Sequence, residues 1–241
     1  MEKWTLRATF PATNSMKPTV AIIGCAGKLG SRLARNLSQA GYPLSLVARQ
    51  ATEASATMET IRSVHPFGDI EVFDSPRDAC WDSDIVIPAV PYTVQAAIAG
   101  RIREVASGKI VISVANPEFE PIGGLTGFPT SAAEELASLL PHSKIVKAFN
   151  TTFAQTFDRR DLSEKDVDCF VAGDDEQAVR TVSLLVKETG FNPVVAGKLA
   201  VSRTLENMMA MLIRLDRNLD AHGFAGWKVI HHPGYAKEPA V

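Results

Sequence analysis

Three regularly spaced glycines give the clearest chemical signal in the sequence. Gly24, Gly27 and Gly30 lie in the run GCAGKLG, directly after the apolar run TVAIIG, and leucines then recur at every fourth position. Glycines at such a strand-to-helix turn let backbone N–H groups approach a phosphate, and the following helix N-terminus favours negative charge. The spacing differs from the usual G-x-G-x-x-G fingerprint, but its place in the chain predicts a dinucleotide site.

The residues after the second predicted strand indicate which dinucleotide binds. An NAD site usually has an acidic residue there, which accepts hydrogen bonds from the ribose hydroxyls. No Asp or Glu occurs between Gly24 and Thr52, whereas Arg49 directly follows the apolar run LSLVA. A guanidinium suits a 2′-phosphate in charge and geometry, so we expect NADP(H). The alternative for Arg49 is an ordinary solvated surface charge.

No other residues form a convincing catalytic or metal-binding group. Lys147 and Asn150 end a predicted strand, where they can touch a substrate carbonyl, but Lys147 fits a solvent-facing position equally well. His231-His232 has no ligand partner at suitable spacing, so no metal site is expected. The three cysteines are scattered, which favours a reducing cytoplasm over a disulfide framework. The catalytic residues stay unassigned.

Short apolar runs alternate with helical patterns along most of the chain. Helical patterns follow the glycines up to Gly41, cover residues 54–65 weakly, and extend from Asp174-Asp175 to Gly190. This alternation predicts an α/β fold, a doubly wound and mostly parallel sheet of the NAD(P)-binding Rossmann type. The predicted strands lie at residues 19–24, 44–48, 69–73, 84–90, 109–115, 144–149, 167–173 and 192–197.

The C-terminal part has a different pattern. Apolar residues from Val201 to Leu219 recur at alternating intervals of four and three, which predicts a long amphipathic helix with a coiled-coil-like seam. The seam can pack on its own sheet or also on a second copy, and we expect a homodimer through this helix. We divide the chain into an N-terminal extension (1–17), an NADP-binding Rossmann domain (18–198) and a small C-terminal helical part (199–241).

Composition excludes several classes of protein. The chain is 46% hydrophobic, and its 25 basic and 27 acidic residues leave a net charge of -2. That balance argues against a nucleic-acid partner. No apolar run approaches the ~18 residues of a membrane span, and the N-terminus lacks the apolar core of a secretory signal. We therefore expect a cytoplasmic globular protein whose partner is a small molecule.

Several segments together resemble a known family. The turn GCAGKLG, the run KAFNT at Lys147–Thr151 and the run VAGDDEQAVRTVSLLVKETGFNPVVAGKLAVSRTLE are similar to the NADP oxidoreductases that depend on the deazaflavin coenzyme F420. This family also includes the reductase domains of the eukaryotic membrane ferric reductases. The likeness extends roughly from residue 18 to residue 235, with a closing Gly-x-x-Gly-aromatic-Lys pattern at Gly223–Lys228.

The resemblance implies hydride exchange between NADP(H) and a flavin or deazaflavin ring. It implies that Arg49 binds the 2′-phosphate. From the residues that line the predicted pocket, we also expect Phe149 and Tyr92 to offer aromatic faces to the second ring. The residues it places at the pyrophosphate are Gly24, Ala26, Gly27, Lys28 and Leu29. Those it places near the ribose and nicotinamide are Val90, Pro91, Tyr92, Ala115, Asn116, Ala148, Asn150 and Thr151.

Some positions depart from the family pattern. Ala26 and Ala48 stand where deazaflavin-dependent members tend to have hydroxyls, so the 2′-phosphate rests more heavily on Arg49. The residues after Tyr92 and the run from Asn150 to Phe153 also differ, which leaves the acceptor open among deazaflavin, FMN, FAD, a ferric chelate and a small carbonyl or imine.

Three functions follow from these observations. A flavin or deazaflavin reductase needs mainly positioning and exclusion of water, which fits the lack of a general acid. A reductase of a small imine or 2-keto acid normally builds its substrate site from a larger helical domain than one helix. The third is a non-catalytic regulatory protein that binds NADPH.

Overall fold

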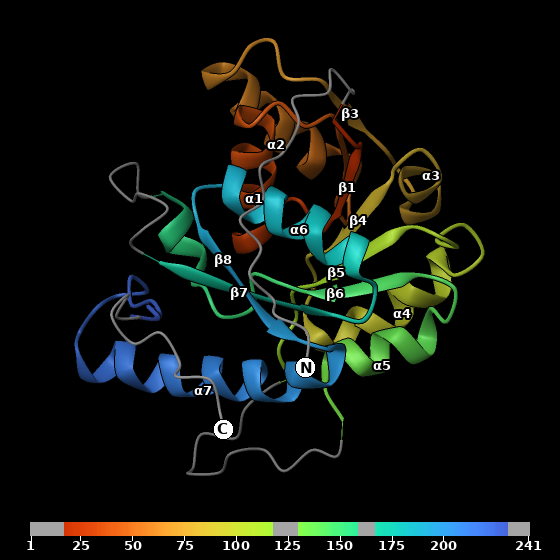
Figure 1. Cartoon of the computed structure of the whole chain (residues 1–241). Coiled ribbons are helices and arrows are strands. Elements are labelled where there is room, and N and C mark those ends of the chain that lie inside the picture. Colours follow the sequence, from red (N-terminus) through yellow and green to blue (C-terminus); the bar gives the residue numbers. More distant parts are fainter. Residues whose placement is uncertain (1–16, 118–129, 159–166, 231–241) are drawn as a thin grey trace.

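The computed structural model describes residues 17–117, 130–158 and 167–230. Its centre is an eight-stranded sheet of order β3-β2-β1-β4-β5-β6-β7-β8, in which every neighbouring pair is parallel except β6 and β7 (Figure 1). The predicted doubly wound, mostly parallel α/β fold is confirmed. The strands are β1 (Val20–Ile23), β2 (Leu44–Val47), β3 (Ile70–Val72), β4 (Ile85–Pro88), β5 (Ile110–Ser113), β6 (Lys144–Lys147), β7 (Asp168–Gly173) and β8 (Asn192–Gly197).

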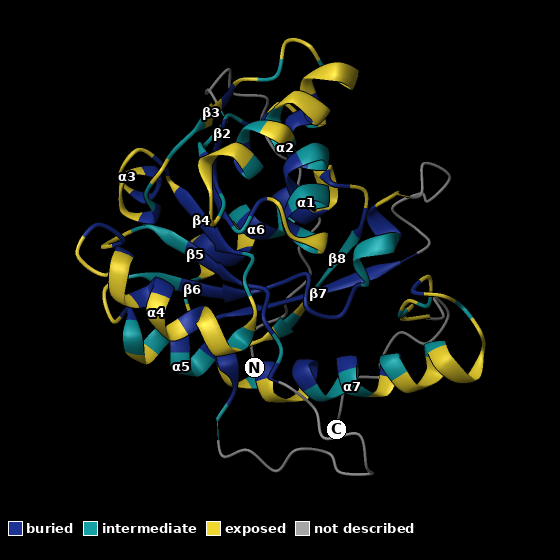
Figure 2. Ribbon diagram, turned by 180° about the vertical axis from the view of Figure 1, so that it is seen from behind, coloured by how far each residue is buried: buried dark blue, intermediate teal, exposed yellow. Residues whose placement is uncertain are grey.

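Helices cover both faces of this sheet, which explains why the strands are continuously apolar. Along β1, Val20 and Ile22 face the core under α1, α2 and α6, whereas Ala21 and Ile23 face the core under α3, α4 and α5. Figure 2 shows the buried strands between the two helical layers. The helices are α1 (Lys28–Gln39), α2 (Ala51–Val64), α3 (Pro76–Trp81), α4 (Tyr92–Ile102), α5 (Ala132–Leu139), α6 (Glu176–Glu188) and α7 (Ser202–Asn218), with 3₁₀ turns η1 (Ala154–Asp158) and η2 (Leu199–Val201).

The helices that the sequence predicted are the four longest within the described residues, with 12 to 17 residues each. At the start of α6 the Asp175 side chain accepts a hydrogen bond from Ala178 N at 2.7 Å, and Gly190 beyond its end has φ +96°. By contrast, α3, α4 and α5 were not predicted. The first is six residues long and the third eight, and α4 is rich in alanine without a regular stripe.

The predicted C-terminal helix is present, and its two halves have different surroundings. Leu205 and Leu212 are 2% exposed, and Leu205 packs with Phe170 of β7 on the chain's own sheet. Further along, Leu215 and Leu219 are 36% and 70% exposed. Packing on its own sheet therefore accounts for the first half of the seam but not for the second.

The segment after α7 returns to β7. Asp168, the first residue of β7, accepts hydrogen bonds from Lys228 Nζ at 2.7 Å and from Val229 N, and its own N–H donates to Trp227 O at 2.9 Å. Burial alone would raise the pKa of Asp168, but Lys228, Val229 and Asn192 outweigh it and hold this pKa below its usual value. The closing Gly-x-x-Gly-aromatic-Lys pattern thus ties the tail to the sheet.

Candidate functional site

The strand order places a crevice between β1 and β4. From β1 the chain builds β2 and β3 on one side, and from β4 it continues with β5 and β6 on the other. Ligands of open α/β sheets bind at such a switch point, beyond the carboxyl ends of the strands. Residues 24–30, the glycine turn, lie at this edge, and Ala89 after β4 donates to Ile23 O at 2.8 Å.

The three glycines of this turn are required for different reasons. Gly24 has φ +95°, and a Cβ there would lie 2.5 Å from Ala89 O. A Cβ on Gly30 would lie 2.2 Å from Gly24 O, so only glycine lets α1 pack this closely. A Cβ on Gly27 would meet nothing nearer than Gly24 O at 3.3 Å, and Gly27 is exposed. The space beside Gly27 is therefore open to a ligand.

The helix after this turn begins without a side-chain cap. Gly27 is its N-cap residue, and among the described residues no side chain caps α1 and none in its first turn is acidic. In contrast, Ser75, Ser131 and Asp175 cap α3, α5 and α6 through their side chains. The first N–H groups of a helix have no partner within the helix, and an anion satisfies them well. The glycine turn therefore fits a pyrophosphate.

Arg49 lies at the same edge, beyond β2. Its side chain is 86% exposed, and its nearest charged neighbour is Glu53 of α2, with 3.9 Å between Nη2 and Oε1. Gln50 and Glu53 cap the start of α2 reciprocally. The stretch of sequence from Gly24 to Thr52 has no acidic residue. Glu53 is the next residue, so sequence reasoning missed its carboxylate. Arg49 is nevertheless free to reach a bound phosphate.

A groove runs from the glycine turn along α1. It has a volume of about 900 Å³ and extends from Ala26 and Glu53 to Asp158 at the end of η1. Arg32 and Arg35 of α1 line it, and both bind the Asp158 carboxylate, at 2.7 and 2.6 Å. These two arginines therefore already have an anionic partner, unlike the largely solvated Arg49.

The remaining residues predicted for the pyrophosphate and ribose lie at the same edge. Lys28 is exposed and Leu29 half-buried at the start of α1. Val90 is half-buried beside Gly24, Pro91 is the exposed N-cap residue of α4, and Tyr92 is its first residue. The structure thus brings these residues together, while their contacts with a cofactor stay a prediction.

At the other side of the switch point, the residues after β5 and β6 meet. Asn116 Nδ2 donates to Asn150 O at 3.1 Å, and Asn150 Nδ2 donates to Asn116 Oδ1 at 3.0 Å; we call these two residues the amide pair. Asn150 Oδ1 and Thr151 Oγ1 are buried and have no hydrogen-bond partner within the described residues. Ala115 and Ala148 are 8% and 0% exposed.

The expectation that Phe149 offers an aromatic face to a ligand is wrong. Phe149 is 0% exposed, and its ring packs against those of Phe157 and Phe191 at centroid distances of 5.8 and 6.4 Å. Its φ is +61°, in the left-handed region that a bulky residue rarely adopts, and this backbone turns the ring into the core. Such strain is typical of functional sites.

Tyr92 is half-buried, and its hydroxyl is already engaged. It donates to Glu135 Oε2 of α5 at 2.6 Å, and this contact, aided by burial, raises the pKa of Tyr92 to about 12. Tyr92 therefore stays protonated at neutral pH.

A solvent-facing Lys147 is also excluded. Its side chain is 0% exposed, and Nζ lies 2.7 Å from Glu206 Oε1 of α7; we call these residues the buried ion pair. Burial lowers the pKa of Lys147, and Glu206 partly offsets this shift. Sequence reasoning missed Glu206, although the residue shares the buried face of α7 with Leu205 and Met209. The place of Lys147 in a strand that is buried on both faces was another signal, because a buried lysine needs an anionic partner.

The described residues offer no alternative centre. Within them, no group of three or more His, Cys, Asp or Glu side chains could hold a metal ion. His231-His232 lies outside this part of the chain. Burial raises the pKa of Cys25 in the glycine turn to about 11, so its thiol is not a reactive thiolate. No helix in the described ranges is long and apolar enough to cross a membrane.

Proteins of similar sequence include F420-dependent NADP reductases and metalloreductases. A model of the family described as NADP oxidoreductase, coenzyme F420-dependent, matches residues 19–117. The F420-dependent NADP reductase of Methanocaldococcus jannaschii is 28% identical over 213 residues, covering 85% of this chain and 95% of the relative. Metalloreductase STEAP2 of Homo sapiens is 28% identical over 206 residues, covering 85% of this chain but 38% of the relative.

Solved structures support the fold. A protein from Arthrobacter sp. FB24, described as a candidate F420-dependent NADP reductase, has a TM-score of 0.75 and 23% identity, covering 89% of this chain and 100% of that chain. An imine reductase from Myxococcus stipitatus has a TM-score of 0.62 and 17% identity, covering 86% of this chain and 64% of that chain. With the glycine turn at the switch point, these matches show a chain that is similar to coenzyme F420-dependent NADP oxidoreductases over more than four-fifths of its length.

Proposed function

We propose that this protein transfers a hydride between NADP(H) and a flavin or deazaflavin ring. The observation that carries the proposal is the open glycine turn at the switch point, in a chain similar to F420-dependent NADP reductases over more than four-fifths of its length. The nicotinamide supplies or accepts the hydride when bound. The residues of the chain bind it, orient it and exclude water.

The adenosine and pyrophosphate half of the cofactor belongs at the glycine turn. We assign the pyrophosphate to Gly24, Ala26, Gly27 and the first N–H groups of α1 at Lys28 and Leu29. The exposed guanidinium of Arg49 is assigned to the 2′-phosphate, because it is a charged donor whose ion pair with Glu53 is long, at 3.9 Å.

The nicotinamide half belongs beyond β4, β5 and β6, near Val90, Pro91 and Tyr92 and at the amide pair. Asn116 is half-buried, whereas Asn150 and Thr151 are 2% and 0% exposed, so Asn116 is the residue that can bond the carboxamide of nicotinamide, which carries both donors and an acceptor. Asn150 supports Asn116 through the amide pair, and Asn150 Oδ1 and Thr151 Oγ1 have no partner within the described residues. With Ala115 and Ala148 beside them, these residues form the wall that we assign to this half.

A panel of acceptors tests the proposed activity. Oxidation of NADPH should be measured with deazaflavin F420, FMN, FAD and ferric chelates in parallel, and with NADH as the matched donor control. We expect turnover with one or more of the ring acceptors and a preference for NADPH. Turnover with ferric chelates alone would favour a metalloreductase activity. Tight NADPH binding without turnover across the panel would favour a regulatory protein and reject the proposal.

We also propose a homodimer in the cytoplasm. Met211, Leu215 and Leu219 on the second half of α7 are 47%, 36% and 70% exposed and form an apolar surface that a second copy can cover. The free thiols of Cys25, Cys80 and Cys169 fit a reducing compartment.

Charged substitutions test this dimer. Met211→Glu with Leu219→Glu should give monomers in light scattering, because two unpaired carboxylates would enter the interface. Arg217→Glu, on another side of α7, is the matched control and should leave the mass unchanged. Leu212 is unsuitable, since it is already buried within one subunit. A folded double variant of unchanged mass would reject this interface.

A further inference from the structure

The buried ion pair lies behind the nicotinamide side of the proposed site. Lys147 and Glu206 have side chains that are 0% and 5% exposed, and they join the end of β6 to the second turn of α7. Two charges removed from water are costly, and such a pair persists only where its geometry is well satisfied. Because Lys147 has no exposed surface, it does not reach a substrate itself.

Each partner of the pair also holds a backbone group. Lys147 Nζ donates to Ala115 O, directly before Asn116, and Glu206 Oε2 accepts from Ala132 N at 3.1 Å. Ala132 is the first residue of α5, whose positive helix end suits the carboxylate. The pair therefore fixes the end of β5 and the starts of α5 and α7 relative to β6.

The amide pair is tied to the same helix one residue earlier. Asn150 Nδ2 donates to Leu205 O at 3.0 Å as well as to Asn116 Oδ1. Leu205 of α7 thus holds Asn150 directly. The next residue, Glu206, holds Asn116 indirectly, through Lys147 and the carbonyl of Ala115. A shift of α7 would displace both amides of the proposed nicotinamide wall.

We propose that Lys147 and Glu206 are positioning residues for the nicotinamide half of NADP(H), an inference that rests on the proposed function. They keep Asn116 and Asn150 in place without touching the cofactor. The adenosine half is assigned to different elements, the glycine turn and Arg49. Loss of the pair should therefore weaken one half of the cofactor's contacts and spare the other.

Two ligands separate these halves in calorimetric titrations. NADP⁺ contains both halves, whereas adenosine 2′,5′-bisphosphate lacks the nicotinamide. Glu206→Gln keeps the shape and removes the charge, and we expect it to weaken NADP⁺ binding by roughly 10-fold. Binding of the bisphosphate should stay within about twofold, because an intact glycine turn and Arg49 carry it.

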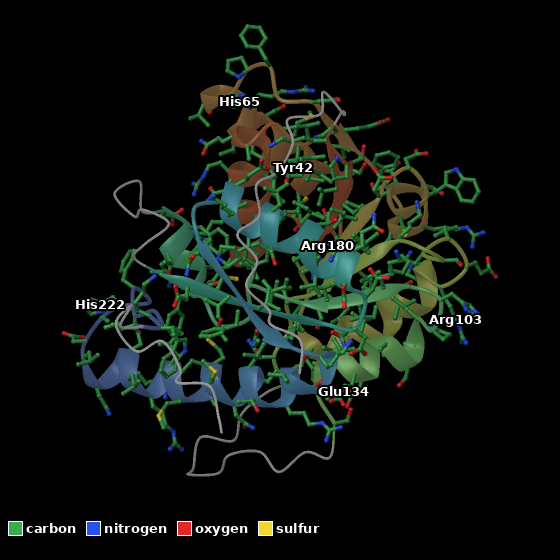
Figure 3. All side chains as sticks on the ribbon, viewed as in Figure 1. Tyr42, His65, Arg103, Glu134, Arg180 and His222 are labelled. Carbon is green, nitrogen blue, oxygen red and sulfur yellow. The ribbon has the colours of Figure 1, made fainter. Side chains whose placement is uncertain are left out.

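Two further variants serve as controls. Arg203→Gln removes an exposed ion pair with Glu134 that joins the same two helices, and it should change neither affinity. Figure 3 labels Glu134 where α5 meets the start of α7. The double variant Lys147→Met/Glu206→Gln leaves no lone buried charge, so it keeps the fold if a single variant does not. It should still bind NADP⁺ weakly, since Ala115 O has lost its partner.

The outcomes are distinguishable. Equal losses for NADP⁺ and the bisphosphate would show that the pair supports the whole fold, and unchanged affinities would show that it positions nothing; either result overturns the inference. If the unaltered chain binds neither ligand, the proposed function itself is rejected.

Hydrogen exchange on the unaltered chain gives a test that does not depend on a variant folding. NADP⁺ should slow exchange at the Ala132 N–H, which is bonded to Glu206, more than the bisphosphate does. Equal protection by the two ligands would overturn the inference.

Discussion

The two sides of the proposed site are built in opposite ways. The glycine turn holds its ligand with backbone N–H groups, and it depends on side chains being absent at three positions within seven residues. The other side is a closed network of side chains from β5, β6 and α7, in which a buried lysine and a buried glutamate are paired. We therefore expect an added methyl group to disturb the glycine turn, and a removed charge to disturb the network around the buried ion pair.

Breaking the buried ion pair should have the largest effect on stability. Lys147→Met or Glu206→Gln leaves one charge buried without its partner, and each should lower the free energy of unfolding by about 3–5 kcal/mol. The double variant should lose less than the sum of the two. Urea denaturation of the three variants measures this coupling, and strictly additive losses would contradict it.

Two alanine substitutions should separate fold from binding within the glycine turn. Gly24→Ala places a Cβ 2.5 Å from Ala89 O at a positive φ, and we expect a loss of about 2–4 kcal/mol of stability. Gly27→Ala meets only Gly24 O, at 3.3 Å, and has an ordinary φ of -72°, so its stability should change by no more than about 1 kcal/mol.

Unlike stability, NADPH binding should be strongly weakened by Gly27→Ala. The new methyl group of Gly27→Ala would stand between the pyrophosphate and the N–H groups of α1, so NADPH affinity should fall by roughly 10- to 150-fold. Thermal unfolding and calorimetric titration of the same sample decide the matter. A folded Gly27→Ala protein with unchanged NADPH affinity would remove the glycine turn from the site.

The third prediction concerns cofactor choice at the adenosine end. Arg49→Ala should weaken NADPH binding by roughly 10- to 150-fold, since a charge-assisted hydrogen bond contributes about 1.5–3 kcal/mol. NADH lacks the 2′-phosphate and should bind almost as before. Glu53→Gln, which keeps the α2 cap, is the matched control and should not weaken NADPH. Equal losses of NADPH and NADH in Arg49→Ala would mean that Arg49 only supports the fold.

The sequence predicts those parts of the fold whose signals are local. The strand before Gly24, the stripe of α1 and the Asp175 cap of α6 each lie within about ten residues, which matches the range of periodicity and capping rules. The antiparallel direction of β7 has no such local signal, because it is a property of its pairing with β6. The helices α3 and α5 are short, and the buried face of α4 includes a glutamine, so none of the three shows a long apolar stripe in the sequence, although Ser75 and Ser131 cap the two short ones.

The same distinction holds for the site. The glycine turn and Arg49 could be proposed from adjacent residues, and the structure places both at the switch point. Lys147 and Glu206 lie 59 positions apart, so nothing near either one indicates its partner. Phe149 was misplaced because its positive φ, invisible in the sequence, reverses the direction of its ring.

The smallest effect is expected for the exposed counterpart of the buried ion pair. Arg203 and Glu134 join α7 to α5 at 2.6 Å, but the side chain of Arg203 is 49% exposed, so solvent screens the pair. Arg203 beside Glu134, together with Ser131, holds the pKa of that carboxyl below its ordinary value of 4.5. A carboxyl whose pKa is lower in the folded state stabilises the fold at pH values above its unfolded-state pKa. This contribution is lost as the pH falls through its folded-state pKa. The difference in the free energy of unfolding between the unaltered chain and Arg203→Gln should therefore be small at neutral pH and vanish in acid. Denaturation at a series of pH values measures it. A difference that is as large as that of Glu206→Gln, or that persists in acid, would mean that Arg203 stabilises α7 by packing rather than by charge.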